Sequence, residues 1–309
     1  MSSMLLIPDF LRAHQAAGRP RLPVLERMLA RAGRCETRHP AACLAPLFGL
    51  TAGDIHEAPF TRLADGGTPD EGWWLRADPV HLAPDRDQLV LMPESVLELA
   101  HAETHALSEA FNRLFSGDGW HLEFPQVLRG YLLCPKPLDA VTHDPAPFVG
   151  GAVLAAMPSG PDAPRLKSLM SEVEMLFHTH AVNTAREEAG RPPINSLWFW
   201  GGGRLPAVTG VAPLQIVSDL PLVQGLARWA RREAVPSASV KHIDTDSLIA
   251  LPAGDLAALE RDWFTPLFAA LKDGRLTHLD IHLGGLGDFV LDRSGAQRFW
   301  RRGRPLGTS

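Results

Sequence analysis

The chain has 309 residues, of which 45% are hydrophobic and 21% charged, and its formal net charge is −5. These values are typical of a soluble globular protein with a sizeable core. The negative charge argues against a nucleic-acid-binding surface or a polybasic membrane patch, and the basic run at 301–304 is too short to change this conclusion.

The N-terminus and the cysteines carry expectations about the cellular compartment. The N-terminal segment has neither a basic region nor a long apolar run, so we expect no signal peptide and no membrane span. Cys35, Cys43 and Cys134 show no CxxC spacing, which favours reduced thiols in a cytoplasmic protein.

Apolar periodicity and turn residues predict strands and helices in alternation. In chain order we expect a strand at 4–9, a helix at 22–34, strands at 73–82 and 87–92, a helix at 95–115, a helix at 166–189, strands at 195–200 and 213–217, a helix at 220–233, strands at 240–243 and 248–251, a helix at 256–272 and a strand at 277–282. This alternation predicts an α/β fold with a mainly parallel central sheet flanked by helices.

Two local signals set boundaries within this pattern. Ser95 and Glu98 have the spacing of a capping box, so the helix at 95–115 is expected to begin at Ser95. Residues 157–165 are rich in Pro, Gly, Ser and Asp, and they mark the best internal boundary in what we otherwise expect to be a single domain, 1–309.

The most informative segment is 174–204. It places His178, His180, Asn183 and Arg186 on one predicted helix, followed by a tryptophan-rich strand and the glycine triplet 201–203. Polar side chains beside a loop whose backbone amides can approach a ligand are how many anion sites are built. We therefore expect an anion-binding site here, although a glycine triplet alone is weak evidence for phosphate binding.

A second candidate site lies on the predicted strand at 277–282. Alternate residues of a strand share a face, so His278, Asp280 and His282 are expected to converge and could hold a divalent cation. The carboxyl ends of strands are where α/β sheets place their sites. The alternative is a polar face packed under a helix or at a sheet edge.

Residues 195–203 (Asn-Ser-Leu-Trp-Phe-Trp-Gly-Gly-Gly), preceded by His180, Asn183 and Arg186, resemble a stretch of the archaeal-type cofactor-independent phosphoglycerate mutases. That family belongs to the alkaline-phosphatase-like superfamily, whose members use two divalent metals and a Ser or Thr nucleophile. A closer resemblance, over most of the chain, is to bacterial RpfE-type regulatory proteins, and residues 74–82 and 198–203 carry it. Both resemblances imply an alkaline-phosphatase-like α/β fold.

The chain departs from the mutase pattern where catalysis would lie. The first strand keeps Asp9, but Phe10 replaces the glycine that follows it in the mutases. Residues 39–43, upstream of a turn that resembles theirs, offer no Ser or Thr nucleophile. The strand that ends at His282 is not followed by the Asp-x-x-x-His metal pair. The chain thus keeps the scaffold with an altered, degenerate site.

These departures favour a divergent, non-catalytic relative of the mutases that acts as a regulatory or anionic-ligand-binding protein. Its ligand would be a small phosphorylated molecule or a similar anion. The residues expected to bind it are Arg76, Asp78, His81, His180, Asn183, Arg186, Asn195 and Arg204.

Two alternatives remain open at this point. The first is a metal-dependent phosphomutase or phosphohydrolase with a rearranged site, in which Asp9, His278, Asp280 and His282 would ligate Mn or Zn. The second is a module that binds a protein partner, in which some of the eight tryptophans would be exposed anchors. For Trp198 and Trp200, which alternate onto one strand face, we expect core packing instead.

Overall fold

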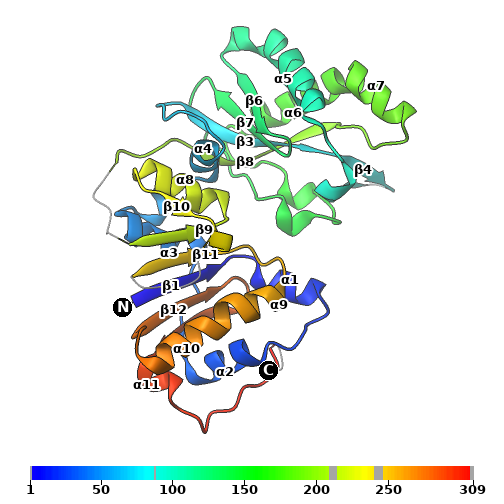
Figure 1. The fold of residues 1–309 in the computed structure, drawn as a ribbon. Helices are drawn as coiled ribbons and strands as arrows, with labels where there is room; N and C mark the ends of the chain where they lie inside the picture. Colours follow the sequence, from blue (N-terminus) through cyan, green and yellow to red (C-terminus); the bar gives the residue numbers. More distant parts are fainter. Residues whose placement is uncertain (1, 87, 209–213, 240–245, 307–309) are drawn as a thin grey trace. The chain divides into compact units, whose positions relative to one another are not determined.

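A computed structural model describes residues 2–86, 88–208, 214–239 and 246–306 (Figure 1). The chain divides into two compact units: unit 1 is Met1–Ile55 with Val208–Ser309, and unit 2 is His56–Ala207. Unit 2 is therefore inserted into the sequence of unit 1. The boundary expected near 157–165 falls inside unit 2. The strand expected at 240–243 lies outside the described residues.

Unit 1 is built on a seven-stranded sheet in the order β10-β9-β11-β1-β12-β13-β2. The first five strands of this order pair in parallel, and β13 and β2 add antiparallel pairs at one edge. The prediction of a mainly parallel central sheet flanked by helices is confirmed. The strands are β1 (Ser2–Ile7), β2 (Gly33–Cys35), β9 (Gln215–Ser218), β10 (Ala234–Val235), β11 (Ser247–Ala250), β12 (His278–Leu283) and β13 (Gly287–Asp292).

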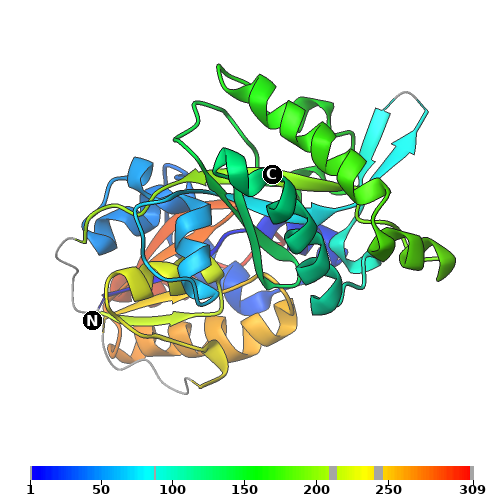
Figure 2. The same ribbon diagram turned by 90° about the horizontal axis from the view of Figure 1, so that it is seen from above.

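One face of this sheet carries the main core of unit 1. Leu5 and Ile7 of β1 and Ile281 of β12 pack with α2, α9 and α10, and all three side chains are fully buried. Figures 1 and 2 show α9 and α10, in gold to orange, running along the strands. Burying each such aliphatic side chain contributes about 1.5–3 kcal/mol. The helices of unit 1 are α1 (Phe10–Ala16), α2 (Pro23–Arg31), α3 (Pro40–Leu44), α8 (Pro221–Trp229), α9 (Leu256–Leu259), α10 (Thr265–Asp273) and α11 (Arg293–Ala296).

A tight turn after β12 brings two strand ends together. The Gly284 amide donates to the carbonyl of Ile7, and the Leu11 amide donates to the carbonyl of Gly284. A Cβ on Gly284 would overlap the carbonyl oxygen of Pro8, so only glycine fits between the end of β1 and this turn. The turn returns the chain as β13, in which Asp288 lies opposite His282.

Unit 2 contains a four-stranded antiparallel sheet in the order β6-β7-β3-β8. The sequence predicted neither β6 nor β7, so the parallel arrangement expected throughout holds only for unit 1. Helices α5 and α6 contact this sheet (Figure 2). The elements are α4 (Glu57–Ala64), β3 (Trp73–Val80), β4 (Leu82–Asp85), β5 (Gln88–Leu91), α5 (His101–Phe115), β6 (His121–Gln126), β7 (Arg129–Cys134), α6 (Ala163–His178), α7 (Ala181–Glu188) and β8 (Ser196–Gly203).

Two predicted helices have different bounds in the structure. The prediction of a single helix at 166–189 is wrong, because the structure has two helices, α6 and α7. His180 lies between them with an extended backbone, and its Nδ1 accepts a hydrogen bond from the Val182 amide at the start of α7. The helix expected from Ser95 begins instead at His101, where the Glu103 carboxylate accepts a hydrogen bond from the Ala100 amide. In both cases a polar side chain at the start of the helix accepts a hydrogen bond from a backbone amide that has no partner within the helix.

The glycine triplet at the end of β8 lies directly against α4. A Cβ on Gly201 would crowd Glu57, and one on Gly203 would overlap the His56 ring. Gly201 also has φ +63°, a conformation that glycine adopts without strain. The triplet therefore allows α4 to pack closely on β8.

Among the described residues, no helix combines the length and the apolar character that a membrane crossing requires.

Candidate functional site

Four residues of unit 1 meet beside the carboxyl end of β12, and we call them the Cys43 cluster: Arg38, Cys43, His282 and Asp288. Cys43 comes from α3, His282 from the end of β12 and Asp288 from the start of β13. The His282 Nδ1 lies 3.0 Å from the Asp288 Oδ2 and 3.3 Å from the Cys43 Sγ. These three side chains are almost completely buried.

Arg38 closes the cluster from its solvent side. Its backbone amide donates to the Asp288 Oδ2 at 3.0 Å, and its Nε lies 3.5 Å from the same oxygen. Its Nη2 lies 3.4 Å from the His282 Nε2. An arginine can only donate, so the Nε2 of His282 accepts the hydrogen bond from Arg38. The Nδ1 of His282 then carries the ring proton and donates a hydrogen bond to Asp288. The Arg38 side chain remains 46% exposed.

The Cys43 thiol is held in its neutral form. Burial raises the pKa of Cys43 to about 11; Arg38 opposes this shift, whereas Asp288 and Asp280 add to it. A thiolate is the reactive form of cysteine, so this side chain is a poor nucleophile at neutral pH.

The same cluster has the donor atoms for one metal ion. The ligand atoms of Cys43, His282 and Asp288 all lie within 4.8 Å of one another. Sulfur, imidazole nitrogen and carboxylate oxygen are the donors that zinc takes. The donor set fits a single ion, provided that the His282 Nδ1 loses its proton and that Arg38 yields its contact with Asp288.

The four predicted metal ligands do not all meet at this point. His282 belongs to the Cys43 cluster, whereas His278 and Asp280 pair with each other at 3.2 Å nearer the start of β12. Asp9 is exposed after β1 and pairs with Arg12 at 3.2 Å. Sequence reasoning missed Arg38, Cys43 and Asp288. The signal for Asp288 was the glycine-rich turn, because a hairpin there places Asp288 opposite His282.

A second polar group lies in unit 2, centred on Arg76 of β3. Its Nη2 donates to the Asp78 Oδ1 at 2.6 Å, and the Trp200 Nε1 donates to the Asp78 Oδ2 at 2.7 Å. The Arg76 guanidinium also lies over the rings of Tyr131 and Trp200. Burial alone would lower the pKa of Arg76, but Asp78 raises it above its ordinary value. Arg76 and Asp78, both expected to bind a ligand, thus pair with each other, and their role in ligand binding stays a prediction.

Glu57, at the start of α4, is a titratable residue near Arg76 whose pKa is shifted into the neutral range. The residue is half-buried, and burial raises the pKa of its carboxyl to about 7 against the lowering effect of Arg76. Glu57 therefore changes protonation near neutral pH.

The remaining predicted ligand residues have contacts within unit 2. Asn183 bonds both the carbonyl and the amide of Ile194, and the Asn195 side chain bonds both backbone groups of Leu82. The Arg186 Nη1 lies 3.0 Å from the Glu103 Oε1, and its other nitrogens donate to backbone carbonyls.

Three further predicted ligand residues lie around these contacts. The His81 Nδ1 bonds the carbonyl of Pro193, His180 caps α7, and Arg204 is exposed after β8. The structure therefore brings together Arg76 with Asp78, and separately the residues of α7 with the segment 192–195 that follows it.

Of the two tryptophans expected in the core, Trp198 is buried and donates from its indole to the carbonyl of His143. Trp200 is half-buried beside Arg76.

Comparison with known proteins identifies a distant relationship. The chain is 27% identical over 229 residues to a Geobacter sulfurreducens protein named "Probable 2,3-bisphosphoglycerate-independent phosphoglycerate mutase", with 70% of this chain and 56% of the relative covered. It is 30% identical over 161 residues to 2,3-bisphosphoglycerate-independent phosphoglycerate mutase 2 of Methanothermobacter thermautotrophicus, with 47% and 38% covered. The chain thus spans about half or less of the length of these relatives. No family model matches it.

Among solved structures, the alignment with the cofactor-independent phosphoglycerate mutase from Thermoplasma acidophilum covers 99% of this chain and 94% of the mutase chain, at 17% sequence identity and a TM-score of 0.43. A protein from Pyrococcus horikoshii aligns with 91% and 81%, at 14% identity and a TM-score of 0.46. The sequence relationship shows that this chain is distantly similar to the cofactor-independent phosphoglycerate mutases.

Proposed function

We propose that this chain is a phosphoglycerate-mutase-like protein that binds a small phosphorylated anion at the Cys43 cluster without transferring its phosphoryl group. Its role would be regulatory: a protein partner would bind differently to the ligand-bound and the ligand-free chain. The resemblance to RpfE-type regulatory proteins supports the regulatory part. The observation that carries the binding part is Arg38, a half-exposed arginine at the cluster that lies beside the carboxyl end of β12.

The chemistry of the cluster supports binding over turnover. Two-metal phosphoryl transfer requires ligands for two ions and an activated nucleophile. Within the described residues, the one group of three potential ligands is that of Cys43, His282 and Asp288, which suffices for a single ion. The Cys43 thiol is neutral at physiological pH. Arg38, in contrast, is 46% exposed and carries the planar donor fork that suits phosphate oxygens; a bound phosphate would compete with the contacts of Arg38 to Asp288 and His282.

The experiment is a binding titration of the full chain with 3-phosphoglycerate and with inorganic phosphate, combined with a turnover assay. We expect 3-phosphoglycerate to bind, Arg38→Gln to weaken binding by about tenfold or more, and no mutase or phosphatase product. Arg275→Gln is the matched control, because Arg275 is an exposed arginine of the same unit that pairs with Asp273. Unchanged binding in Arg38→Gln would contradict the proposal.

A second candidate function is a metal-dependent phosphohydrolase, and the three donor atoms within 4.8 Å favour it. Cys43, His282 and Asp288 would hold the divalent ion, which would supply a Lewis acid to the phosphoester. Phosphatase activity that requires added zinc or manganese and disappears in His282→Asn would replace the first proposal with this one. About one equivalent of metal per chain, as opposed to two, is the stoichiometry that the donor set allows.

A further inference from the structure

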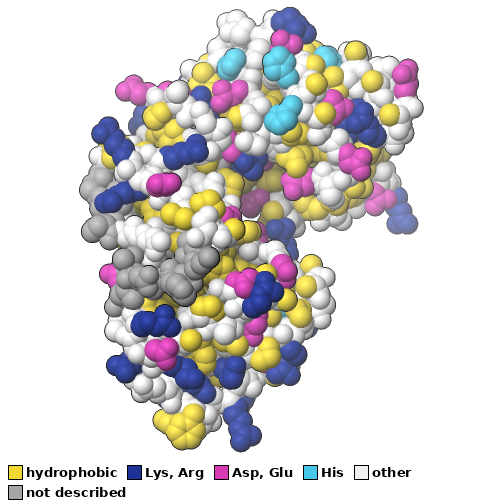
Figure 3. Space-filling model, viewed as in Figure 1, with side chains coloured by type: hydrophobic (Ala, Val, Ile, Leu, Met, Phe, Trp, Pro, Cys, Tyr) yellow, Lys and Arg dark blue, Asp and Glu magenta, His cyan; other side chains and the backbone are white. Residues whose placement is uncertain are grey.

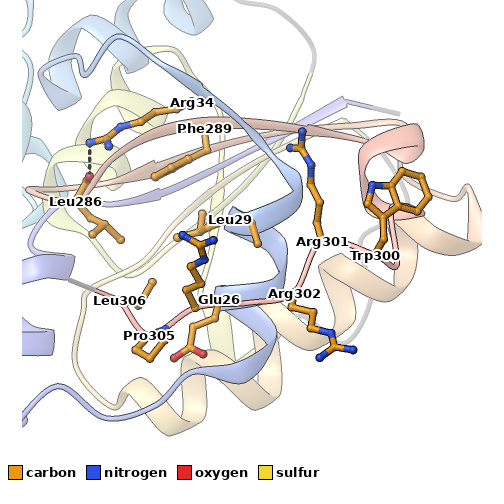
Figure 4. Close-up of a pocket in the computed structure, with 12 residues that line it drawn as sticks. Glu26, Leu29, Arg34, Leu286, Phe289, Trp300, Arg301, Arg302, Pro305 and Leu306 are labelled. Carbon is orange, nitrogen blue, oxygen red and sulfur yellow. Dashed lines mark hydrogen bonds between the residues drawn. The ribbon is translucent and has the colours of Figure 1, made fainter. Parts of the chain in front are cut away.

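A cavity of unit 1, which we call the arginine pocket, lies between α2, β13 and the C-terminal segment (Figure 4). Its volume is about 850 Å³, within the range of small-molecule sites. The walls are formed by Glu26, Leu29, Ala30, Arg34, Leu286, Phe289, Trp300, Arg301, Arg302, Arg304, Pro305 and Leu306.

The arginine pocket is separate from the Cys43 cluster. Phe289, which lines the pocket, and Asp288, which belongs to the cluster, are neighbours on β13. Successive side chains of a strand point to opposite faces of the sheet. Phe289 packs against the core on the α2 face, so the pocket opens on the opposite side of the sheet from Cys43.

The charge of the arginine pocket is one-sided. Its lining holds four arginines and one carboxylate, Glu26, which is already paired with Arg21 through two hydrogen bonds. Hydrogen bonding from Arg21 lowers the pKa of Glu26, so this acid stays ionised and occupied. In Figure 3, Lys and Arg side chains gather on the surface over α2, α11 and the C-terminal segment. This concentration of positive charge occurs in a chain whose net charge is −5.

The arginines have few competing partners within the chain. Arg34 donates to the carbonyl of Leu286 at 3.3 Å and lies 5.9 Å from the Phe289 ring centre. Among the described residues, the guanidinium groups of Arg301, Arg302 and Arg304 have no hydrogen-bond or ion-pair partner. An arginine fork without a carboxylate partner is available to bind phosphate oxygens in a bidentate way.

Aromatic and aliphatic side chains complete the walls. In Figure 4, Leu29 lies near the centre with Phe289 above it, and Trp300 lies to the right, next to Arg301. Trp300 is 65% exposed even though its ring packs edge to face with that of Phe299, with the ring centres 5.3 Å apart, so part of the indole remains accessible to a ligand. Planar bases stack on aromatic rings and on arginine planes, and each such contact is sequence-tolerant. A ligand with both a polyanionic part and a planar ring would use all of these walls.

We propose that the arginine pocket binds a nucleotide with two or more phosphates, in which the arginines contact the phosphates and Trp300 or Phe289 stacks on the base. Each phosphate oxygen pair would take one arginine fork, and more than one phosphate is needed to occupy arginines from both β2 and the C-terminal segment. The pocket would act independently of the ligand at the Cys43 cluster.

The test measures binding of ADP, AMP and inorganic triphosphate to the full chain by calorimetry at a fixed salt concentration. We expect ADP to bind at least tenfold more tightly than AMP, and Arg301→Gln with Arg304→Gln to weaken ADP binding by about tenfold or more. Arg113→Gln, at an exposed arginine of unit 2, should leave the affinity unchanged. Circular dichroism of each variant establishes that it remains folded.

Two further readouts decide the identity of the ligand. ADP should quench tryptophan fluorescence in the wild-type chain and quench it less in Trp300→Phe, whereas inorganic triphosphate should not quench it. Equal affinity for ADP and inorganic triphosphate would overturn the base-stacking part of the proposal. Tighter binding of a single-stranded oligonucleotide than of ADP, or no effect of the paired arginine substitutions, would overturn the proposal as a whole. The two sites would not be independent if 3-phosphoglycerate still bound to Arg38→Gln but no longer bound to the variant that carries both Arg301→Gln and Arg304→Gln. That result would also contradict the proposal.

Discussion

Arg186 provides the sharpest test of which polar residues are structural. Its side chain is fully buried in unit 2, where it contacts the Glu103 carboxylate and donates to the carbonyls of Pro192 and Leu97. Methionine is unbranched and of similar length, so Arg186→Met fills much of the same space but removes every one of these contacts.

The expected loss follows from the groups that the substitution leaves behind. The buried carbonyl of Leu97 and the partly buried carbonyl of Pro192 lose their donors, and an unsatisfied buried group costs about 1–3 kcal/mol. Glu103 keeps the Ala100 amide at 2.8 Å and Arg191 at 3.5 Å, so its charge is not stranded completely. We therefore expect Arg186→Met to destabilise unit 2 by about 3–5 kcal/mol, in the range for breaking a buried pair.

The assay is urea unfolding followed by tryptophan fluorescence, to which unit 2 contributes five of the eight tryptophans of the chain. The control is Arg191→Met, which removes the other arginine partner of Glu103; since Arg191 is 38% exposed, about 1 kcal/mol or less is expected. A free energy of unfolding of Arg186→Met within about 1 kcal/mol of the wild type would refute a structural role. The position would then be open again to the ligand-binding role that the sequence predicted.

Three further predictions concern other buried groups. The pKa of Glu57 in the folded chain is raised to about 7, so the folded state favours the protonated carboxyl. Unit 2 should therefore lose up to about 3 kcal/mol of stability as pH rises from about 4.5 to 7. Unfolding curves at about pH 5 and about pH 8 should show this loss in the wild type and not in Glu57→Gln. Gly284→Ala should prevent folding of unit 1 or cost more than about 3 kcal/mol, whereas Gly254→Ala, which meets nothing within 4 Å, should be near neutral in thermal unfolding. At pH 8 a disulfide reagent such as DTNB should label exposed Cys35 quickly and Cys43 only after denaturation, and equal rates would contradict the burial that holds this thiol neutral.

The local pattern of the sequence predicted individual elements well where burial follows a simple period. The apolar run at 4–9 and the alternation at 277–282 correspond to β1 and β12, which lie side by side in the sheet of unit 1. The pattern failed at His180, because an N-cap inside an apolar helical period can only be recognised once its side chain is known to bond the Val182 amide. It also failed for β6, for which no strand was expected; this strand contains Pro125, which a sheet tolerates at its edge, where the structure places β6.

The sequence by itself indicated an α/β fold with a mainly parallel sheet, which unit 1 has, and it shows that no Ser or Thr lies at 39–43. These properties depend on residue identity and on periods of a few residues. Only the tertiary structure decided which polar residues meet: Cys43 and His282 are 239 positions apart, and packing of α3 beside β12 brings their side chains to 3.3 Å. It also decided that residues 56–207 form a compact unit of their own, inserted into the sequence of unit 1, and that the short basic run at 301–304 lines a cavity with Arg34. Strand pairing and helix packing over such separations create these sites, and no local period in the chain encodes them.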